Sequence, residues 1–150
     1  MQISQVIPAP RDTLYAAFMS AEALVAWLPP QGMSGRIEAF DPREGGGYRM
    51  TLTYDQPDPE MRGKTTTDSD TVDVRFLRLV PGREIVQAAE FASNDPANAG
   101  VMTMTWTFAE AAGGTGVFVH VENAPPGISK ADHETGIRSS LANLAAFVGA

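Results

Sequence analysis

Residues 102–108 read Met-Thr-Met-Thr-Trp-Thr-Phe and alternate apolar with polar side chains. Because successive side chains of a β-strand point to opposite faces of a sheet, this stretch predicts a strand whose Met, Trp and Phe side chains share one face. The chain also contains a segment that can cover this apolar face. Its apolar residues follow the spacing of an amphipathic helix: Ile137, Leu141, Leu144 and Val148. We therefore expect a sheet packed against one long C-terminal helix.

The beginning of that helix is marked in the sequence. Ser129 and Asp132 form a Ser-x-x-Asp pattern, in which the Ser side chain can accept a hydrogen bond from the first helical turn. Glu134 and Arg138 lie four residues apart in the order that favours a helical ion pair. The helix is therefore expected to start just after Ser129.

Composition narrows the range of functions. The 150 residues fit one domain, 1–150, which at this size buries roughly 70% of the surface of the unfolded chain. With 18 Asp and Glu against 11 Lys and Arg, the net charge of −7 argues against nucleic acid as a partner, because phosphate binding needs clustered cations. The absence of Cys excludes disulfides and thiolate nucleophiles. The start, Met-Gln-Ile-Ser, has neither a basic region nor a long apolar run, so we expect no signal peptide, no membrane span and a cytoplasmic protein.

Turn residues divide the rest of the chain into short elements. Pro8 ends a strand over 3–7, Pro10 suits the first position of a helix, and Ser20 suits the N-cap of a second helix that ends before Pro29. Period-two patterns predict further strands at 33–40, 47–54, 72–76, 85–91 and 117–121. The polar segment 56–70 is predicted to be a long loop, and the sequence leaves open whether it acts as a lid. This order favours an α+β domain with an antiparallel sheet.

Five stretches, in their order and spacing, carry a resemblance that covers essentially the whole chain. They are Ile7-Pro8-Ala9-Pro10-Arg11-Asp12 with Phe18 and Trp27, Asp41-Pro42-Arg43-Glu44-Gly45-Gly46-Gly47-Tyr48, Leu79-Val80-Pro81-Gly82-Arg83-Glu84-Ile85-Val86, Gly113-Gly114-Thr115, and the helix from Asp132-His133 to Leu144. The chain resembles the activator-of-heat-shock-protein-ATPase-like branch of the helix-grip superfamily, whose other members include the birch pollen allergen and the lipid-transfer START domains.

The resemblance implies a helix-grip fold, with a curved antiparallel sheet of about seven strands wrapped around the long C-terminal helix. It also implies an apolar cavity between sheet and helix, with two short helices after the first strand that close one end. Relatives include polyketide cyclases and lipid carriers, and no shared catalytic motif can be transferred. This chain has Gly136-Ile137 where many relatives carry Gly-Trp, and Val121 where a His often ends the strand. Both departures would make the cavity wall more aliphatic.

A set of large apolar side chains is expected to line such a cavity. Methionine is flexible and polarizable, so a wall that is rich in it can adapt to irregular apolar ligands. The alternative is that the same residues fill a solid core. The candidates are Trp27, Met50, Tyr54, Met102, Met104, Trp106, Ile137 and Leu141.

One histidine is a candidate acid or base. His133 lies one helical turn before Ile137 on the same face, which places it near the end of the expected cavity. Tyr48 and Tyr54 can add hydroxyl groups to the same space. The alternative for His133 is a solvated or capping residue in the first helical turn, and the alternative for the tyrosines is a buried ring with a satisfied hydroxyl.

The sequence predicts no metal site and no cofactor. His120 and Glu122 share one strand face and are both metal-ligand types, but no third ligand follows from the spacing, and an exposed polar strand face explains them better than a metal site does. Glu90 is ambiguous because its strand alternates poorly, and a buried carboxylate there would indicate function.

Three functional hypotheses follow. The first is a protein that binds an apolar or amphipathic small molecule, such as a lipid-like ligand, without an established catalytic role. The second is a cyclase or dehydratase-like enzyme in which His133 and a tyrosine move protons on a polyketide-like substrate. The third is a chaperone-interacting module, which a sizeable exposed apolar patch would favour. Exposed sheet edges are in addition compatible with a homodimer.

Overall fold

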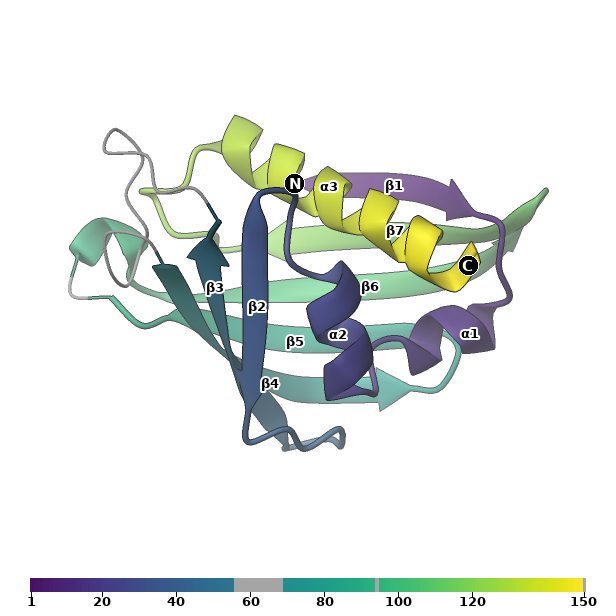
Figure 1. Ribbon diagram of the computed structural model, residues 1–150, viewed down its shortest axis with the longest axis horizontal. Coiled ribbons are helices and arrows are strands. Elements are labelled where there is room, and N and C mark those ends of the chain that lie inside the picture. The colour runs from purple at the N-terminus through teal and green to yellow at the C-terminus, as the bar shows by residue number, and fades with distance from the viewer. Residues whose placement is uncertain (56–68, 94, 150) are drawn as a thin grey trace.

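The computed structural model describes residues 1–55, 69–93 and 95–149, and the described strands form one antiparallel sheet of order β1-β7-β6-β5-β4-β3-β2 (Figure 1). The strands are β1 (Gln2–Ile7), β2 (Met33–Glu38), β3 (Gly47–Tyr54), β4 (Ser69–Val80), β5 (Glu84–Phe91), β6 (Val101–Ala111) and β7 (Gly114–Glu122). The helices are α1 (Arg11–Ala16), α2 (Ala21–Trp27) and α3 (Lys130–Gly149), together with a 3₁₀ turn at Pro96–Asn98. The predicted α+β helix-grip fold is confirmed.

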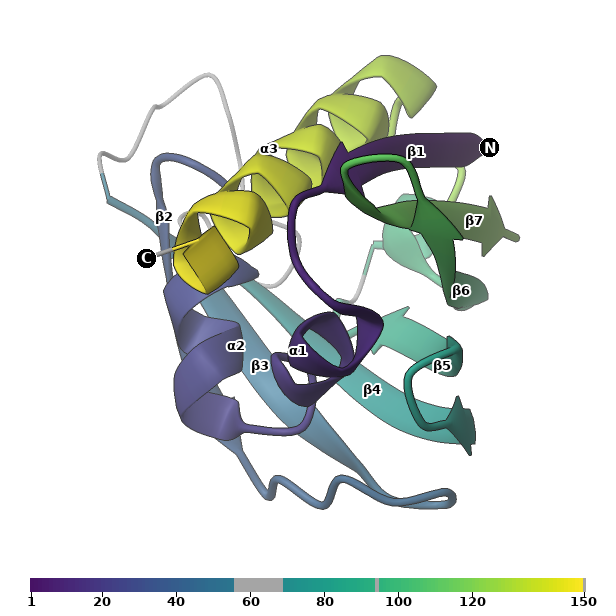
Figure 2. The ribbon, with the colours of Figure 1, turned by 90° about the vertical axis from the view of Figure 1, so that its right-hand side faces the viewer.

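The sheet curves around α3, and the two short helices pack near the C-terminal end of α3 (Figures 1 and 2). The inner face of β6 carries Met102, Met104, Trp106 and Phe108, as the alternation predicted, and Trp106 pairs with Ile85 of β5 and Val119 of β7. Ile137, Leu141 and Leu144 of α3 are buried against this face, whereas Val148 near the end of the helix is half-buried. The apolar face is therefore covered as expected.

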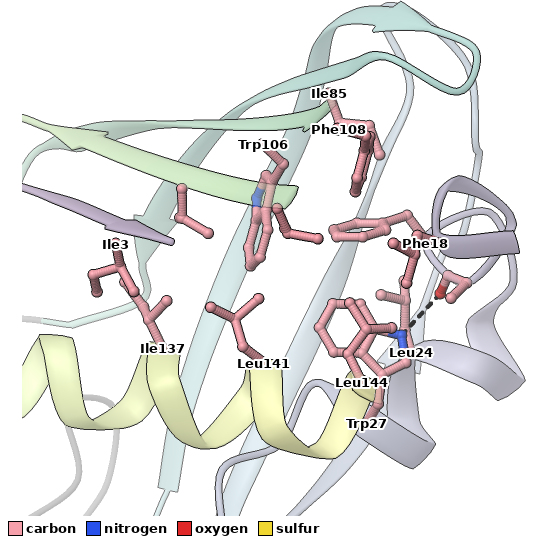
Figure 3. Packing of buried hydrophobic residues seen from close by; sticks show 14 of the residues in the cluster. Ile3, Phe18, Leu24, Trp27, Ile85, Trp106, Phe108, Ile137, Leu141 and Leu144 are labelled. Atoms are coloured by element: carbon pink, nitrogen blue, oxygen red, sulfur yellow. Dashed lines mark hydrogen bonds between the residues drawn. The ribbon is translucent and has the colours of Figure 1, made fainter. Parts of the chain in front are cut away.

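Four aromatic rings fill the space beneath the C-terminal half of α3 (Figure 3). The ring of Phe18 lies edge-on to Trp27, Trp106 and Phe108, with centroid distances of 4.9, 5.0 and 5.7 Å. Trp27 is fully buried, and its indole nitrogen donates a hydrogen bond of 2.9 Å to the carbonyl oxygen of Ala17. Edge-to-face packing with a satisfied indole is a favourable arrangement for aromatic side chains in a core. This end of the molecule is therefore solid.

Polar side chains of α3 attach the helix to the connection between α2 and β2. The hydroxyl of Ser140 donates to the carbonyl oxygen of Leu28 at 2.6 Å, and the amide of Asn143 donates to that of Pro29 at 2.9 Å. The hydroxyl of Ser139 accepts from the backbone nitrogen of Gln31 at 2.9 Å. These three bonds fix the position of α3 along its axis, because each needs one register between the helix and the connection.

The helix-start signals are confirmed in detail. The hydroxyl of Ser20 accepts from the backbone nitrogen of Ala23 at 3.3 Å, and the hydroxyl of Ser129 accepts from that of Asp132 at 3.0 Å. The predicted Pro10 position is off by one residue, because Pro10 is the N-cap of α1 and has extended backbone angles. Such shifts of one residue are common at helix ends.

Two strand boundaries differ from the predicted ones. The second strand ends at Glu38 rather than at residue 40, because Ala39 takes a positive φ of 54° that breaks the extended backbone. β4 begins at Ser69, three residues before the predicted start, because Ser69 and Asp70 pair with Thr53 and Leu52 of β3. Most of the predicted loop 56–70 lies outside the described residues, and its last two residues belong to the sheet.

Replacement of Leu141 by Ala should test the importance of the helix cover. Leu141 is fully buried, so the Leu141→Ala change should lower the free energy of unfolding by about 2–5 kcal/mol through lost burial and a cavity. Phe147 on the same helix is 41% exposed, and Phe147→Ala should cost clearly less. Urea unfolding followed by circular dichroism measures both, and equal losses would contradict the proposed packing.

Candidate functional site

The eight predicted cavity residues divide into two groups by burial. Six are buried, namely Trp27, Met50, Met102, Trp106, Ile137 and Leu141. Tyr54 and Met104 are half-buried. The buried tryptophans and Leu141 belong to the packed aromatic end described above. The two half-buried residues, Tyr54 and Met104, lie on the inner face away from that end.

Met104 is less buried than its neighbours on the inner face of the sheet. It lies on β6, a central strand, between Gln87 of β5 and Val121 of β7, which are both buried. Its position on the strand places it on the inner face with Met102 and Trp106, which are only 4% and 2% exposed, whereas Met104 is half-buried. With paired strands on both sides, the exposed part of Met104 lies on the side that faces α3.

Further half-buried side chains lie on the same face near the ends of β3, β4 and β5. Val72 pairs with Phe91 and with Met50 across the sheet, and Leu52 pairs with Asp70. We call the set of half-buried inner-face residues the open end: Leu52, Tyr54, Val72, Phe91 and Met104. Sequence reasoning had not selected Leu52, Val72 or Phe91, although period-two spacing places Leu52 on the face of Tyr54. Their grouping depends on the register between strands.

A buried polar network separates the open end from the aromatic end. Gln87 is 5% exposed, and its side-chain oxygen accepts a hydrogen bond of 3.0 Å from the indole nitrogen of Trp106. Gln87 also hydrogen-bonds the hydroxyl of Tyr48, and burial raises the pKa of that tyrosine far above its ordinary value. Gln87 was not predicted to be important. The sequence offers one indication of its role, a single polar residue at an inward-facing strand position. A polar side chain on a buried face requires hydrogen-bond partners.

Titratable groups gather at the rim of the open end. Burial raises the pKa of Tyr54, and the carboxylates of Asp70 and Asp132 raise it further. Asp132 directly precedes His133, which is half-buried in the first turns of α3. The proximity of Tyr54 and His133 stays a prediction, because the electrostatic effect on Tyr54 comes from Asp132, the residue before His133.

The other candidates lie outside this site. His120 and Glu122 are exposed on the outer face, where the His Nε2 and a Glu carboxylate oxygen are 3.0 Å apart. Glu90 is also exposed. Within residues 1–55, 69–93 and 95–149, no three His, Asp or Glu side chains cluster closely enough to hold a metal ion. In the same part of the chain, no helix has the length and apolar character needed to cross a membrane.

Comparison with known proteins gives the family. A family model described as "Activator of Hsp90 ATPase homolog 1-like protein" matches residues 8–149, nearly the full chain. The chain belongs to this family. A search of curated proteins gave no significant match.

Solved structures share the fold over the whole chain. A protein from Chromobacterium violaceum is similar with 29% identity and a TM-score of 0.86, covering 100% of this chain and 96% of that one. A protein from Arthrobacter aurescens has 14% identity and a TM-score of 0.80, with coverages of 99% and 84%. DynU16, a protein of the dynemicin biosynthetic locus, has 18% identity and a TM-score of 0.67, with coverages of 99% and 46%. The last two show the fold alone.

Alkaline conditions should destabilise this family member through Tyr48. The folded-state pKa of Tyr48 is raised, so above pH about 10 the unfolded chain loses the tyrosine proton more readily than the folded one, and stability falls as pH rises. Below that pH the contribution is fully present. Urea unfolding at several pH values should show a shallower alkaline loss for Tyr48→Phe than for wild type. Tyr54→Phe is the control, and an equal flattening by both changes would contradict the special burial of Tyr48.

Proposed function

We propose that the protein binds an apolar or amphipathic small molecule at the open end of the inner face. The observation that carries the proposal is the accessible Met104 side chain on a central strand that faces α3. A space bounded by Met104, Val72 and Phe91 offers an apolar, adaptable wall. An internal apolar site of this kind suits the fold, and the ligand would enter beside the start of α3.

The polar groups of the interior favour an apolar ligand. Across the described residues, no buried side-chain nitrogen or oxygen lacks a hydrogen-bond partner. Gln87, Trp106 and Tyr48 satisfy one another, so the deep wall requires no polar group from a ligand. A polar head group would instead lie at the rim, where Tyr54 and His133 are half-buried. This arrangement fits a molecule with an apolar body and one polar end.

The test is native mass spectrometry of the purified protein, combined with release and identification of any retained molecule. We expect a stoichiometric apolar adduct, or failing that a thermal shift with fatty acids or aromatic polyketides. Met104→Glu should weaken binding at least about tenfold, because a carboxylate in an apolar site is costly to desolvate. Thr53→Glu is the matched control, since Thr53 is exposed on a neighbouring part of the sheet.

The control separates loss of binding from loss of fold. Both variants should retain the circular dichroism spectrum of the wild type, and only Met104→Glu should lose the ligand. An apo mass together with no thermal shift for any tested lipid or polyketide would overturn the proposal. Equal weakening by both variants would also place the ligand elsewhere.

A second candidate is a cyclase or dehydratase-like enzyme, favoured by the electrostatic effect on Tyr54 of Asp132, which precedes His133. In this hypothesis His133 would accept a proton and Tyr54 would donate one to the bound substrate. His133→Gln and Tyr54→Phe should then abolish conversion of an added polyketide precursor, followed by mass spectrometry, while binding persists. Unchanged conversion, or binding without any conversion by wild type, would reject the enzyme hypothesis and leave the binding proposal intact.

A further inference from the structure

The outer face of the sheet, opposite α3, carries exposed apolar residues among its charged ones. Among the described residues, five large apolar side chains are strongly exposed, and the strand register places three of them on this face. They are Val6, Val101 and Phe118, with exposures of 53%, 50% and 38%. Single exposed apolar residues are normal, so they do not by themselves indicate a partner.

The centre of this face has uncharged residues between two glutamates, Glu84 and Glu90 of β5. β5 contributes Val86 and Ala88, and β6 contributes Thr103, Thr105 and Thr107, all of them half-buried. These strands are the middle of the seven-stranded sheet, so the uncharged strip runs along its centre (Figure 1). The threonines are the polar half of the alternation that gives β6 its apolar inner face.

Charged residues flank the strip in a regular way. The register places Arg75, Ala88, Thr103 and Glu122 side by side across β4, β5, β6 and β7. Arg75 on β4 therefore places a positive charge next to the strip on one side, and Glu122 on β7 places a negative charge next to it on the other side. Arg75 is exposed and has no ion-pair partner among the described residues.

This row is complementary to itself under a two-fold rotation. An axis that runs along the strands between β5 and β6 exchanges β4 with β7 and β5 with β6. When two outer faces meet about such an axis, Arg75 of each copy lies opposite Glu122 of the other, and Ala88 lies opposite Thr103. The same residue contacts recur twice, as in every isologous interface.

Two neighbouring rows are compatible with the same axis, whereas in a third row Glu90 would lie opposite Val101. Val86 and Thr105 stand between Arg78 and His120, so Val86 would meet Thr105, and Arg78 would meet an imidazole that in its neutral form accepts hydrogen bonds.

In the following row, Val80 would lie opposite Phe118, an apolar pair. Between them Glu84 would lie opposite Thr107, while its ion pair with Arg78 of the same chain is kept. The ring of Phe118 lies over Gly116, since a Cβ atom added at Gly116 would come within 3.1 Å of a ring carbon. The opposite side of the ring would then face a partner.

We infer that the outer face binds a second copy of this chain, in a symmetric dimer held by the uncharged strip and two reciprocal Arg75–Glu122 ion pairs. Two twisted sheets packed face to face keep their strands within about 30° of one another, which is compatible with an axis along the strands. The charge pattern favours a second copy over an unrelated protein, because the chain itself supplies the complement of Arg75, which is Glu122. The dimer face and the proposed ligand site lie on opposite sides of the sheet, so neither depends on the other.

Charge reversal tests the register of this dimer. Analytical ultracentrifugation of wild type over a concentration series should show a reversible monomer–dimer equilibrium. Arg75→Glu and Glu122→Arg should each raise the dissociation constant at least about tenfold, because each places like charges opposite one another twice. An equimolar mixture of the two variants should form a heterodimer near wild-type affinity, because both opposed positions then carry opposite charges. Arg138→Glu, on the exposed side of α3, is the matched control and should leave the dimer unchanged.

The mixture makes the experiment independent of folding defects, since a misfolded variant cannot be rescued by the reciprocal one. A wild-type protein that stays monomeric up to about 0.5 mM would overturn the inference. So would a dimer that neither charge reversal weakens, or two weakened variants that fail to associate with each other. A monomer whose outer-face variants lose binding to purified Hsp90 would assign the same patch to a chaperone and reject the second copy.

Discussion

The structure depends on the burial of one strand face by one helix. The inner face of β6 carries Met102, Trp106 and Phe108, and these side chains leave water only because α3 lies across them. The sheet has to curve to bring its neighbouring strands against the same helix, and the hydrogen bonds from Ser140 and Asn143 hold the helix in register. The hydrophobic effect thus supplies most of the stabilisation, while a few polar bonds select one position of the helix.

The two ends of this shared core differ in the size of their side chains. At one end, Phe18, Trp27, Trp106 and Phe108 interlock edge to face, and large rings leave little free volume. At the other end the same face carries half-buried residues such as Leu52, Val72 and Met104. The proposed ligand site lies at this less buried end, so a bound ligand would not disturb the interlocked rings.

The alternation that builds the core also shapes the opposite surface. On β6 each inward-facing apolar residue is followed by an outward-facing residue. The outward-facing residues at the centre of the strand are small and uncharged, namely Thr103, Thr105 and Thr107. Because the flanking strands place Arg75 on one side and Glu122 on the other, the outer face has two-fold charge complementarity. The inner face is the proposed site of a small molecule, and the outer face is the proposed site of a second copy of the chain. In these proposals one sheet serves two kinds of binding.

Local patterns in the sequence determined the elements: the alternation of 102–108, the caps at Ser20 and Ser129, and the helical spacing of Ile137 and Leu141 each act within a few neighbouring residues. The resemblance added their arrangement around α3. Tertiary structure alone decided which inward residues are sealed and which remain accessible. Met102 and Met104 are identical in type and phase, yet only one is buried, because exposure depends on what packs above each from elsewhere in the chain. The partners of Gln87 and the placement of the polar Asp70 inside the sheet likewise follow from strand register, a long-range property that local patterns do not encode.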